Sequence, residues 1–247
     1  MAAKVVVVTG ASRGVGAETA VALGARGHDV VVNYREKARR AEKVCERVRE
    51  AGGRAIAVGS DLTDADGPGH LLDGAIAGFG RVDAVVLNAS GGLELGADDG
   101  YAMRLNRNAQ VALTHAATAR MLHCKRIVFV TSHQAHFSES IAPPKEYTEI
   151  AASKLAGEQA LRALIPELEA ADINLQVVSG DMIDGTIIVR LLERRNPAAV
   201  GDRRRHGALP TVTEFAAAIA GAIDSDAPSG HTTYVGGADL WRRPATP

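Results

Sequence analysis

The sequence predicts an α/β fold of the doubly wound type, in which helices cover both faces of a seven-stranded parallel sheet. Short Val-rich runs alternate with longer Ala-rich segments of helical spacing from one end of the chain to the other. This alternation is typical of βαβ units. The runs are almost continuously apolar, as expected for strands that are buried on both faces. A glycine-rich turn joins the first run to the first helical segment.

The strands and helices follow from these runs in order. Strands are predicted over residues 5–8, 30–33, 55–58, 84–87, 127–130, 175–178 and 233–235. Helices are predicted over residues 15–26, 37–51, 66–79, 97–122, 150–164 and 214–223. Gly27 and Gly52 follow two of these helices, where glycine favours a C-terminal cap.

Residues 184–210 are the least regular part of the sequence. Apolar residues mix there with arginines, namely Arg190, Arg194, Arg195, Arg203, Arg204 and Arg205. We expect this segment to be a mobile lid, since loops that cover a site often close on its ligand. Inward-facing arginines would favour an anionic substrate, whereas outward-facing ones would form a solvated basic surface.

Composition limits the kinds of partner. Hydrophobic residues make up 46% and charged residues 23% of the chain, as in ordinary globular domains. The net charge of −1 gives no reason to expect nucleic acid, and no apolar run approaches the roughly 20 residues of a membrane span. Cys45 and Cys124 have neither metal-ligand spacing nor a disulfide framework. We therefore expect one domain over residues 1–247, a small-molecule substrate, no metal, and a cytoplasmic location.

The glycine-rich turn is predicted to hold a dinucleotide. Glycines permit a tight turn and a close approach of the backbone to a pyrophosphate, and the following helix offers unpaired N–H groups. The turn lies between an apolar strand and a helix, which is the context that this motif requires. The predicted contacts are Gly10, Ser12, Arg13, Gly14, Val15 and Gly16.

The end of the second strand predicts the choice of cofactor. It reads Asn33-Tyr34-Arg35, without the acidic residue that binds the ribose 2′-hydroxyl in NAD enzymes. Arg35, assisted by Arg13, could pair with a 2′-phosphate through charge-assisted hydrogen bonds. We therefore predict NADP(H), with Tyr34 beside it; the alternative is two solvated surface arginines.

The spacing Gly-x-x-x-Gly-x-Gly after Thr9 resembles the short-chain dehydrogenase/reductase family, whose members bind dinucleotides on a Rossmann sheet. The resemblance continues in order along nearly the whole chain. Asp61-Leu62 resembles the family's acidic motif beside the adenine, and Asn88-Ala89-Ser90-Gly91 resembles its NNAG motif. Ser179-Gly180 resembles the Pro-Gly pair after the sixth strand, with the proline replaced. The resemblance implies cofactor contacts at Asp61, Leu62, Asn88, Ala89, Lys154 and Gly180; whether Met182, Asp184 or Thr186 lies against the nicotinamide stays open.

The same resemblance implies catalytic residues. Ser132 would orient the substrate oxygen, with Thr131 as a weaker candidate, and Asn106 would hold a water in the proton relay. Lys154 would bind the nicotinamide ribose and stabilise a tyrosinate four residues before it. That position, however, is occupied by Ile150, which can neither donate nor accept a proton.

The nearest tyrosine to the vacated position is Tyr147, seven residues before Lys154. Pro143-Pro144 disfavours helix just before it, so a non-helical segment could bring Tyr147 back into the site. We predict Tyr147 as the displaced acid. Three alternatives stay open: His133 or His136 supplies the proton, water or substrate supplies it, or these side chains merely line the pocket.

These residues lead to one main functional hypothesis, the NADPH-dependent reduction of a ketone, or the reverse oxidation of a secondary alcohol. Within the family the chain most resembles the 3-oxoacyl-carrier-protein reductases, although Ile150 argues against their standard role. The alternative is a catalytically silent NADP(H)-binding or redox-sensing protein. A sugar-nucleotide epimerase or dehydratase is disfavoured by chain length and glycine spacing. The resemblance also implies a homo-oligomer, dimer or tetramer, paired through helices 97–122 and 150–164.

Overall fold

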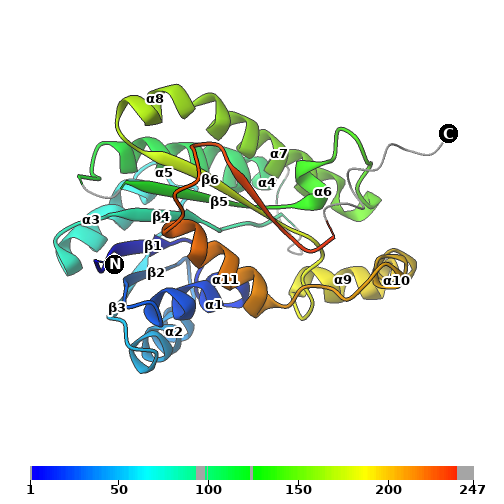
Figure 1. Ribbon diagram of the computed structural model, residues 1–247, viewed down its shortest axis with the longest axis horizontal. Coiled ribbons are helices and arrows are strands. Elements are labelled where there is room, and N and C mark those ends of the chain that lie inside the picture. The colour runs from blue at the N-terminus through cyan, green and yellow to red at the C-terminus, as the bar shows by residue number, and fades with distance from the viewer. Residues whose placement is uncertain (1, 93–97, 99, 123–124, 238–247) are drawn as a thin grey trace.

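The computed structural model, which describes residues 2–92, 98, 100–122 and 125–237, contains one parallel sheet between two layers of helices (Figure 1). The strand order is β3-β2-β1-β4-β5-β6-β7. The strands are β1 (Val5–Val8), β2 (Asp29–Tyr34), β3 (Ala55–Gly59), β4 (Ala84–Leu87), β5 (Arg126–Ser132), β6 (Asn174–Gly180) and β7 (Thr232–Val235). The predicted doubly wound fold with seven parallel strands is confirmed.

Strand β1 explains why the strand sequences are continuously apolar. Its residues pair with β2 on one side and β4 on the other, and all four valines are buried. Val6 and Val8 point into one core cluster, while Val5 and Val7 point into the cluster on the opposite face. Successive side chains of a strand point to opposite faces, so both sets must be apolar when both faces are covered.

The helices divide between these two faces (Figure 1). Helices α1 (Gly14–Gly24), α2 (Ala38–Glu50) and α11 (Val212–Ile223) supply residues to one core cluster. Helices α3 (Gly67–Phe79), α5 (Ala109–Thr118), α7 (Thr148–Ala163) and α8 (Ile165–Ala170) supply residues to the other. Helix α8 was not predicted. None of the helices in the described part of the chain is long and apolar enough to cross a membrane.

The long helix predicted over residues 97–122 differs in the structure. It is built from α4 (Tyr101–Met103), a π-helical turn η1 (Arg104–Asn108) and α5, and it ends at Thr118; residues 97 and 99 lie outside the described residues. The backbone N–H groups of Arg120 and Met121 both turn back to the carbonyl of Ala117, at 2.9 Å each. This turn ends the helix and places the Met121 side chain in the core.

Two helices, α9 (Ile187–Arg195) and α10 (Pro197–Arg205), occupy the segment whose sequence is least regular and for which no helix was predicted. Thr186 caps α9 by accepting from the N–H of Val189 at 3.3 Å, and Asn196 caps α10, whose first residue is a proline. Both helices project from the body of the molecule (Figure 1). Their apolar faces pack together in a small separate cluster of Met182, Val189, Leu192, Val200 and Leu209. Lid motion stays a prediction.

Candidate active site

The glycine-rich turn is fastened to the loop that follows β4 through Thr9. The Thr9 hydroxyl accepts the N–H groups of Asn88 and Ala89, at 2.9 Å each, and donates to the carbonyl of Val86 at 3.1 Å. The Asn88 amide donates to the Thr9 carbonyl at 2.8 Å. Two predicted cofactor motifs, far apart in the sequence, therefore lie together at the carboxyl ends of β1 and β4.

Two glycines of the turn allow this close packing. A Cβ on Gly16 would lie 2.5 Å from the Asn88 side-chain nitrogen and 2.8 Å from the carbonyl oxygen of Gly10. Gly10 has a φ of 61°, and its Cβ would lie 3.0 Å from the backbone of Ala89. Gly14, with a φ of 58°, has open space where its Cβ would be. The N-terminus of α1 is thus accessible to an anionic group.

The remaining predicted cofactor residues occupy the neighbouring strand ends. Ser12 lies in the turn and Val15 in the first turn of α1, and both are half-buried. Arg13, between them, is exposed. Tyr34 ends β2, with its ring 3.0 Å from where a Cβ on Gly59 would lie. Arg35 follows it, with 47% of its side chain exposed. The Asp61 carboxylate accepts hydrogen bonds from the backbone N–H and the hydroxyl of Thr63. Leu62 lies in the hydrophobic core. Gly180 ends β6 and contacts the Phe215 ring.

Asn106 is buried within the π-helical turn, and its side chain is fully engaged. Its Oδ1 accepts from the N–H of Gly91 at 3.1 Å, while its Nδ2 donates to the Gly91 carbonyl at 3.0 Å and to the Ser153 hydroxyl at 2.9 Å. Gln110, one turn later, donates to the carbonyls of Ala89 and Leu105. The side chain of Asn106 therefore holds the β4 loop against α7 and has no donor left for a water.

Lys154 lies on α7 beside this turn. Gly157 allows the approach, because a Cβ there would lie 2.3 Å from the Asn106 carbonyl oxygen. Burial lowers the pKa of Lys154 to about 8, although Glu158 one turn further on acts to raise it. Among the described residues none accepts a hydrogen bond from the Lys154 ammonium, which leaves its donors available.

Tyr147 and Ser132 are brought together, as the sequence suggested. The two hydroxyl oxygens lie 3.4 Å apart, a long hydrogen bond. Residues 145–147 form a 3₁₀ turn, η2 (Lys145–Tyr147), after Pro144, and α7 begins at Thr148. Tyr147 is 5% exposed, and burial raises the pKa of its phenol, opposed by the contact with Ser132. Tyr147 is therefore neutral near pH 7 and carries a proton that it can donate.

Ile150 fills the space beside Tyr147. It lies in a small cluster with Ala102, Ala135, Tyr147 and Ala151, and it is 3% exposed. A Cβ on Gly92 would lie 2.5 Å from the Ile150 Cδ1 atom. The position that carries the family tyrosine is thus a packing position in this chain.

The two histidines considered as alternative acids bond elsewhere. His133 is completely buried, with its Nδ1 2.8 Å from the Ser179 hydroxyl. Burial lowers the pKa of His133 to about 4, although the negative charge of Asp181 acts to raise it, so the ring is neutral near pH 7. His136 lies with Nδ1 2.8 Å from the Glu158 carboxylate and Nε2 2.9 Å from the Tyr234 hydroxyl. Within the part of the chain that the structure describes, neither ring is hydrogen-bonded to Ser132 or Tyr147.

The sequence did not point to the buried charges around the site. The Glu158 carboxylate accepts from His136 and from Arg162 at 2.9 Å; burial opposes its ionisation, yet these hydrogen bonds hold the pKa of Glu158 below its ordinary value. Asp181, directly after β6, pairs with Arg203 of α10. The pair of Glu158 and Arg162 could have been predicted, because the two residues lie four apart on α7. No spacing in the sequence indicates that Asp181 and Arg203 form a pair.

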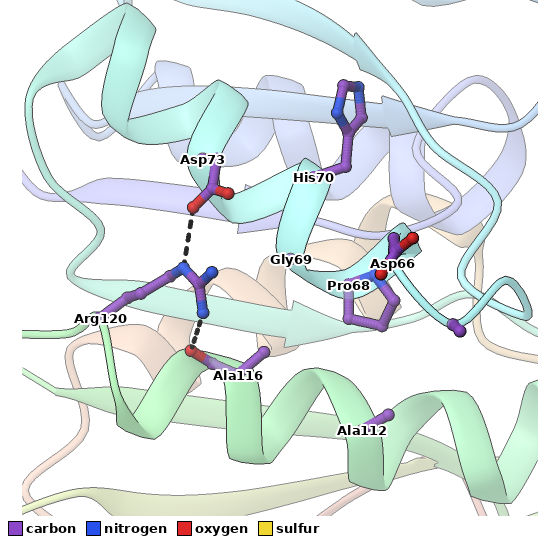
Figure 2. Close-up of a pocket in the computed structure, with 9 residues that line it drawn as sticks. Asp66, Pro68, Gly69, His70, Asp73, Ala112, Ala116 and Arg120 are labelled. Atoms are coloured by element: carbon purple, nitrogen blue, oxygen red, sulfur yellow. Dashed lines mark hydrogen bonds and ion pairs between the residues drawn. The ribbon is translucent and has the colours of Figure 1, made fainter.

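A surface hollow of about 470 Å³ lies away from these groups, between α3 and α5 (Figure 2). Arg120 crosses it to Asp73 at 2.9 Å and to the carbonyl of Ala116 at 3.3 Å. It contains none of the predicted site residues. The polar groups of interest lie instead along the carboxyl ends of the strands, where ligands bind in open α/β sheets.

The seven-stranded parallel sheet, with the glycine-rich turn after its first strand, defines a doubly wound Rossmann-type α/β protein. A family model described as short chain dehydrogenase matches residues 4–196, and the chain belongs to that family, as the sequence motifs predicted. It is 34% identical over 190 residues to a 3-oxoacyl-[acyl-carrier-protein] reductase of Synechocystis, covering 70% of this chain and 77% of that protein.

Two further comparisons are with proteins that are named as reductases. Versicolorin reductase of Emericella nidulans is 37% identical over 138 residues, which cover 53% of this chain and 52% of that protein, so the chain spans about half the length of that relative. The solved structure of an angucycline C-6 ketoreductase with bound NADP superposes with a TM-score of 0.81 at 26% identity, covering 96% of each chain. The relatives are reductases of this family.

Proposed function

We propose that this protein is an NADPH-dependent ketone reductase, with Tyr147 as the proton donor. The observation that carries the proposal is the approach of the Tyr147 and Ser132 hydroxyls to 3.4 Å. Lys154, which is buried on α7, would complete the site. When bound, the nicotinamide supplies a hydride to the carbonyl carbon. Ser132 orients the carbonyl oxygen, and the Tyr147 O–H bond breaks as its proton passes to that oxygen, giving a secondary alcohol.

The residues present fit the cofactor. The cradle at Gly10 and Gly16, the accessible helix N-terminus at Gly14, and the exposed guanidinium groups of Arg13 and Arg35 suit an anionic dinucleotide. Lys154 would donate to the ribose hydroxyls. Asn106 would act indirectly, because its side chain fixes the β4 loop.

The test is consumption of NADPH with a panel of aliphatic, aromatic and thioester-linked ketones. We expect turnover with at least one class. If NADPH binds and no ketone in the panel is reduced, the second candidate, a silent NADP(H)-binding or redox-sensing protein, replaces the first. Ile150 at the usual tyrosine position is the observation that favours that second candidate.

Cofactor preference should depend on the two arginines. We expect the wild type to favour NADPH over NADH, and the paired Arg13→Ala and Arg35→Ala change to remove most of that preference, by roughly 10- to 100-fold, because charged hydrogen bonds to the 2′-phosphate are lost. The measurement is the ratio of kcat/KM values for the two cofactors. Equal values for the wild type would contradict the NADP assignment.

NADPH affinity should fall as the pH rises through about 8, where burial places the pKa of Lys154. Below that pH the ammonium can donate to the ribose; above it the amine is neutral and a weaker donor. The measurement is the Kd for NADPH from pH 6 to 10, with Lys154→Met lacking the dependence. Between about pH 8 and the ordinary lysine pKa of 10.5, the unfolded chain holds a proton that the folded chain lacks, so the free energy of unfolding rises with pH.

The surroundings of the enzyme are further proposals. We place it in the cytoplasm as a homo-oligomer, acting as one domain on a small carbonyl or alcohol. Support comes from the buried Cys45, which forms no disulfide among the described residues, and from the Ala-rich faces of α5 and α7, which suit close helix packing. Light scattering at micromolar concentration tests the oligomer.

A further inference from the structure

Arg35 is hydrogen-bonded to Tyr101, a residue from a distant part of the sequence. The Arg35 Nη1 atom donates to the Tyr101 hydroxyl at 2.7 Å, and its Cζ atom lies 6.0 Å from the centre of that ring. Arg35 follows β2, whereas Tyr101 begins α4, after β4. A side chain from a distant part of the sequence therefore fixes one edge of the guanidinium group.

Tyr101 is itself held in place. The Cζ atom of Arg104 lies 5.8 Å from the centre of the same ring, so the ring has a guanidinium group near it from two different elements. Arg104 in turn donates to both carboxylate oxygens of Asp98, at 2.6 and 2.8 Å. Because Arg104, which is itself paired with Asp98, packs against the ring, Tyr101 can position Arg35 with little loss of side-chain entropy.

The other edge of the Arg35 guanidinium faces carboxylates. Its Nη2 atom lies 2.8 Å from Glu36, and its Nε atom lies 4.0 Å from Asp61. The side chains of Arg35 and Glu36 are 47% and 56% exposed, and an exposed ion pair contributes little to stability. Glu36 can therefore be displaced at low cost, while the neutral Tyr101 hydroxyl does not compete with an incoming anion.

We propose that Tyr101 and Glu36 set the selectivity of this site for a dinucleotide 2′-phosphate. Tyr101 orients the guanidinium group of Arg35, and the phosphate takes the edge that Glu36 occupies in the free protein. The two residues act in opposite directions: Tyr101 favours the phosphorylated dinucleotide, and Glu36 competes with it. The inference rests on the proposed function, since it concerns the same cofactor site.

Calorimetric titration of the full chain with NADP⁺ and NAD⁺ tests both roles. Tyr101→Phe keeps the ring and removes the hydroxyl; we expect NADP⁺ to bind about 3- to 10-fold more weakly and NAD⁺ to be unaffected, the range for loss of one typical hydrogen bond. Glu36→Gln should tighten NADP⁺ binding about threefold and leave NAD⁺ binding unchanged. Glu46→Gln, which removes an exposed carboxylate from α2, is the matched control and should change neither affinity.

A double-mutant cycle shows whether Tyr101 acts through Arg35. In an Arg35→Ala background, Tyr101→Phe should have no further effect on NADP⁺ affinity. The inference is overturned if Tyr101→Phe leaves the affinity ratio of the two dinucleotides unchanged, or weakens both equally. A wild type that prefers NADP⁺ and reduces a ketone would then keep the proposed function intact. A wild type that does not prefer NADP⁺ overturns both.

Discussion

Replacement of Tyr147 by phenylalanine is expected to remove most turnover, lowering kcat by about 10²- to 10⁴-fold, the range for loss of a positioned acid. NADPH affinity should remain nearly unchanged, because the phenol lies beside Ser132 rather than along the glycine-rich turn. Phenylalanine keeps the ring in its buried cluster, so the fold should persist. The measurement is kcat on the best ketone of the panel together with the Kd for NADPH.

The outcome of that experiment also decides between tyrosine and histidine. Tyr234→Phe is the matched control, since it removes a phenol hydroxyl that contacts His136 and lies outside the proposed site. His133→Ala and His136→Ala belong in the same assay. Near-normal turnover by Tyr147→Phe would show that Tyr147 only lines the pocket, and a selective loss in a histidine variant would then identify the donor.

Replacement of Arg203 by methionine should lower the free energy of unfolding by about 3–5 kcal/mol, the usual cost of leaving a buried charge without its partner. Asp181 and Arg203 have side chains that are 0% and 8% exposed, and the pair joins the end of β6 to α10. The Asp181 carboxylate also accepts the backbone N–H of Met182 at 2.7 Å. Chemical denaturation at pH 7 measures the loss.

The double variant Asp181→Asn with Arg203→Met distinguishes a buried charge from lost packing. Asparagine keeps an acceptor for Met182 and removes the charge, so most of the stability should return. If the double variant is as unstable as Arg203→Met alone, the cost comes from packing of α10 rather than from the unpaired carboxylate.

Proteolysis of residues 184–210 with and without NADPH would show whether α9 and α10 also move as a lid.

The strands could be predicted from the sequence because burial on both faces leaves one solution, continuous apolar runs. The glycine-rich turn could be predicted for a related reason: its positions 10 and 16 require glycine, because a Cβ at either would meet Asn88 or Ala89. Helix ends were harder to predict. The end of α5 at Thr118 depends on where Met121 enters the core, which is a tertiary contact.

The parts of the site that escaped prediction depend on side chains meeting across the fold. Asp181 and Arg203 are joined only because α9 and α10 fold back on β6, and Tyr101 meets Arg35 only because β2 and β4 end at the same edge of the sheet. No local pattern encodes such pairs. The approach of Tyr147 to Ser132 could be predicted from the sequence, because Ile150 cannot carry a proton and the prolines before Tyr147 disfavour helix there.

The packing around Ile150 has an evolutionary consequence. Ile150 and Tyr147 fill one cluster, and the Gly92 loop closes directly over the isoleucine. A phenol at position 150 would be larger than the isoleucine and is expected to crowd the ring at position 147 and the backbone of Gly92. The two positions are therefore epistatic: neither substitution alone recreates the family arrangement without passing through an overpacked or an acid-free intermediate. Such coupling would make the proposed acid at position 147 hard to move back to position 150, so homologues are expected to keep both residues or exchange both.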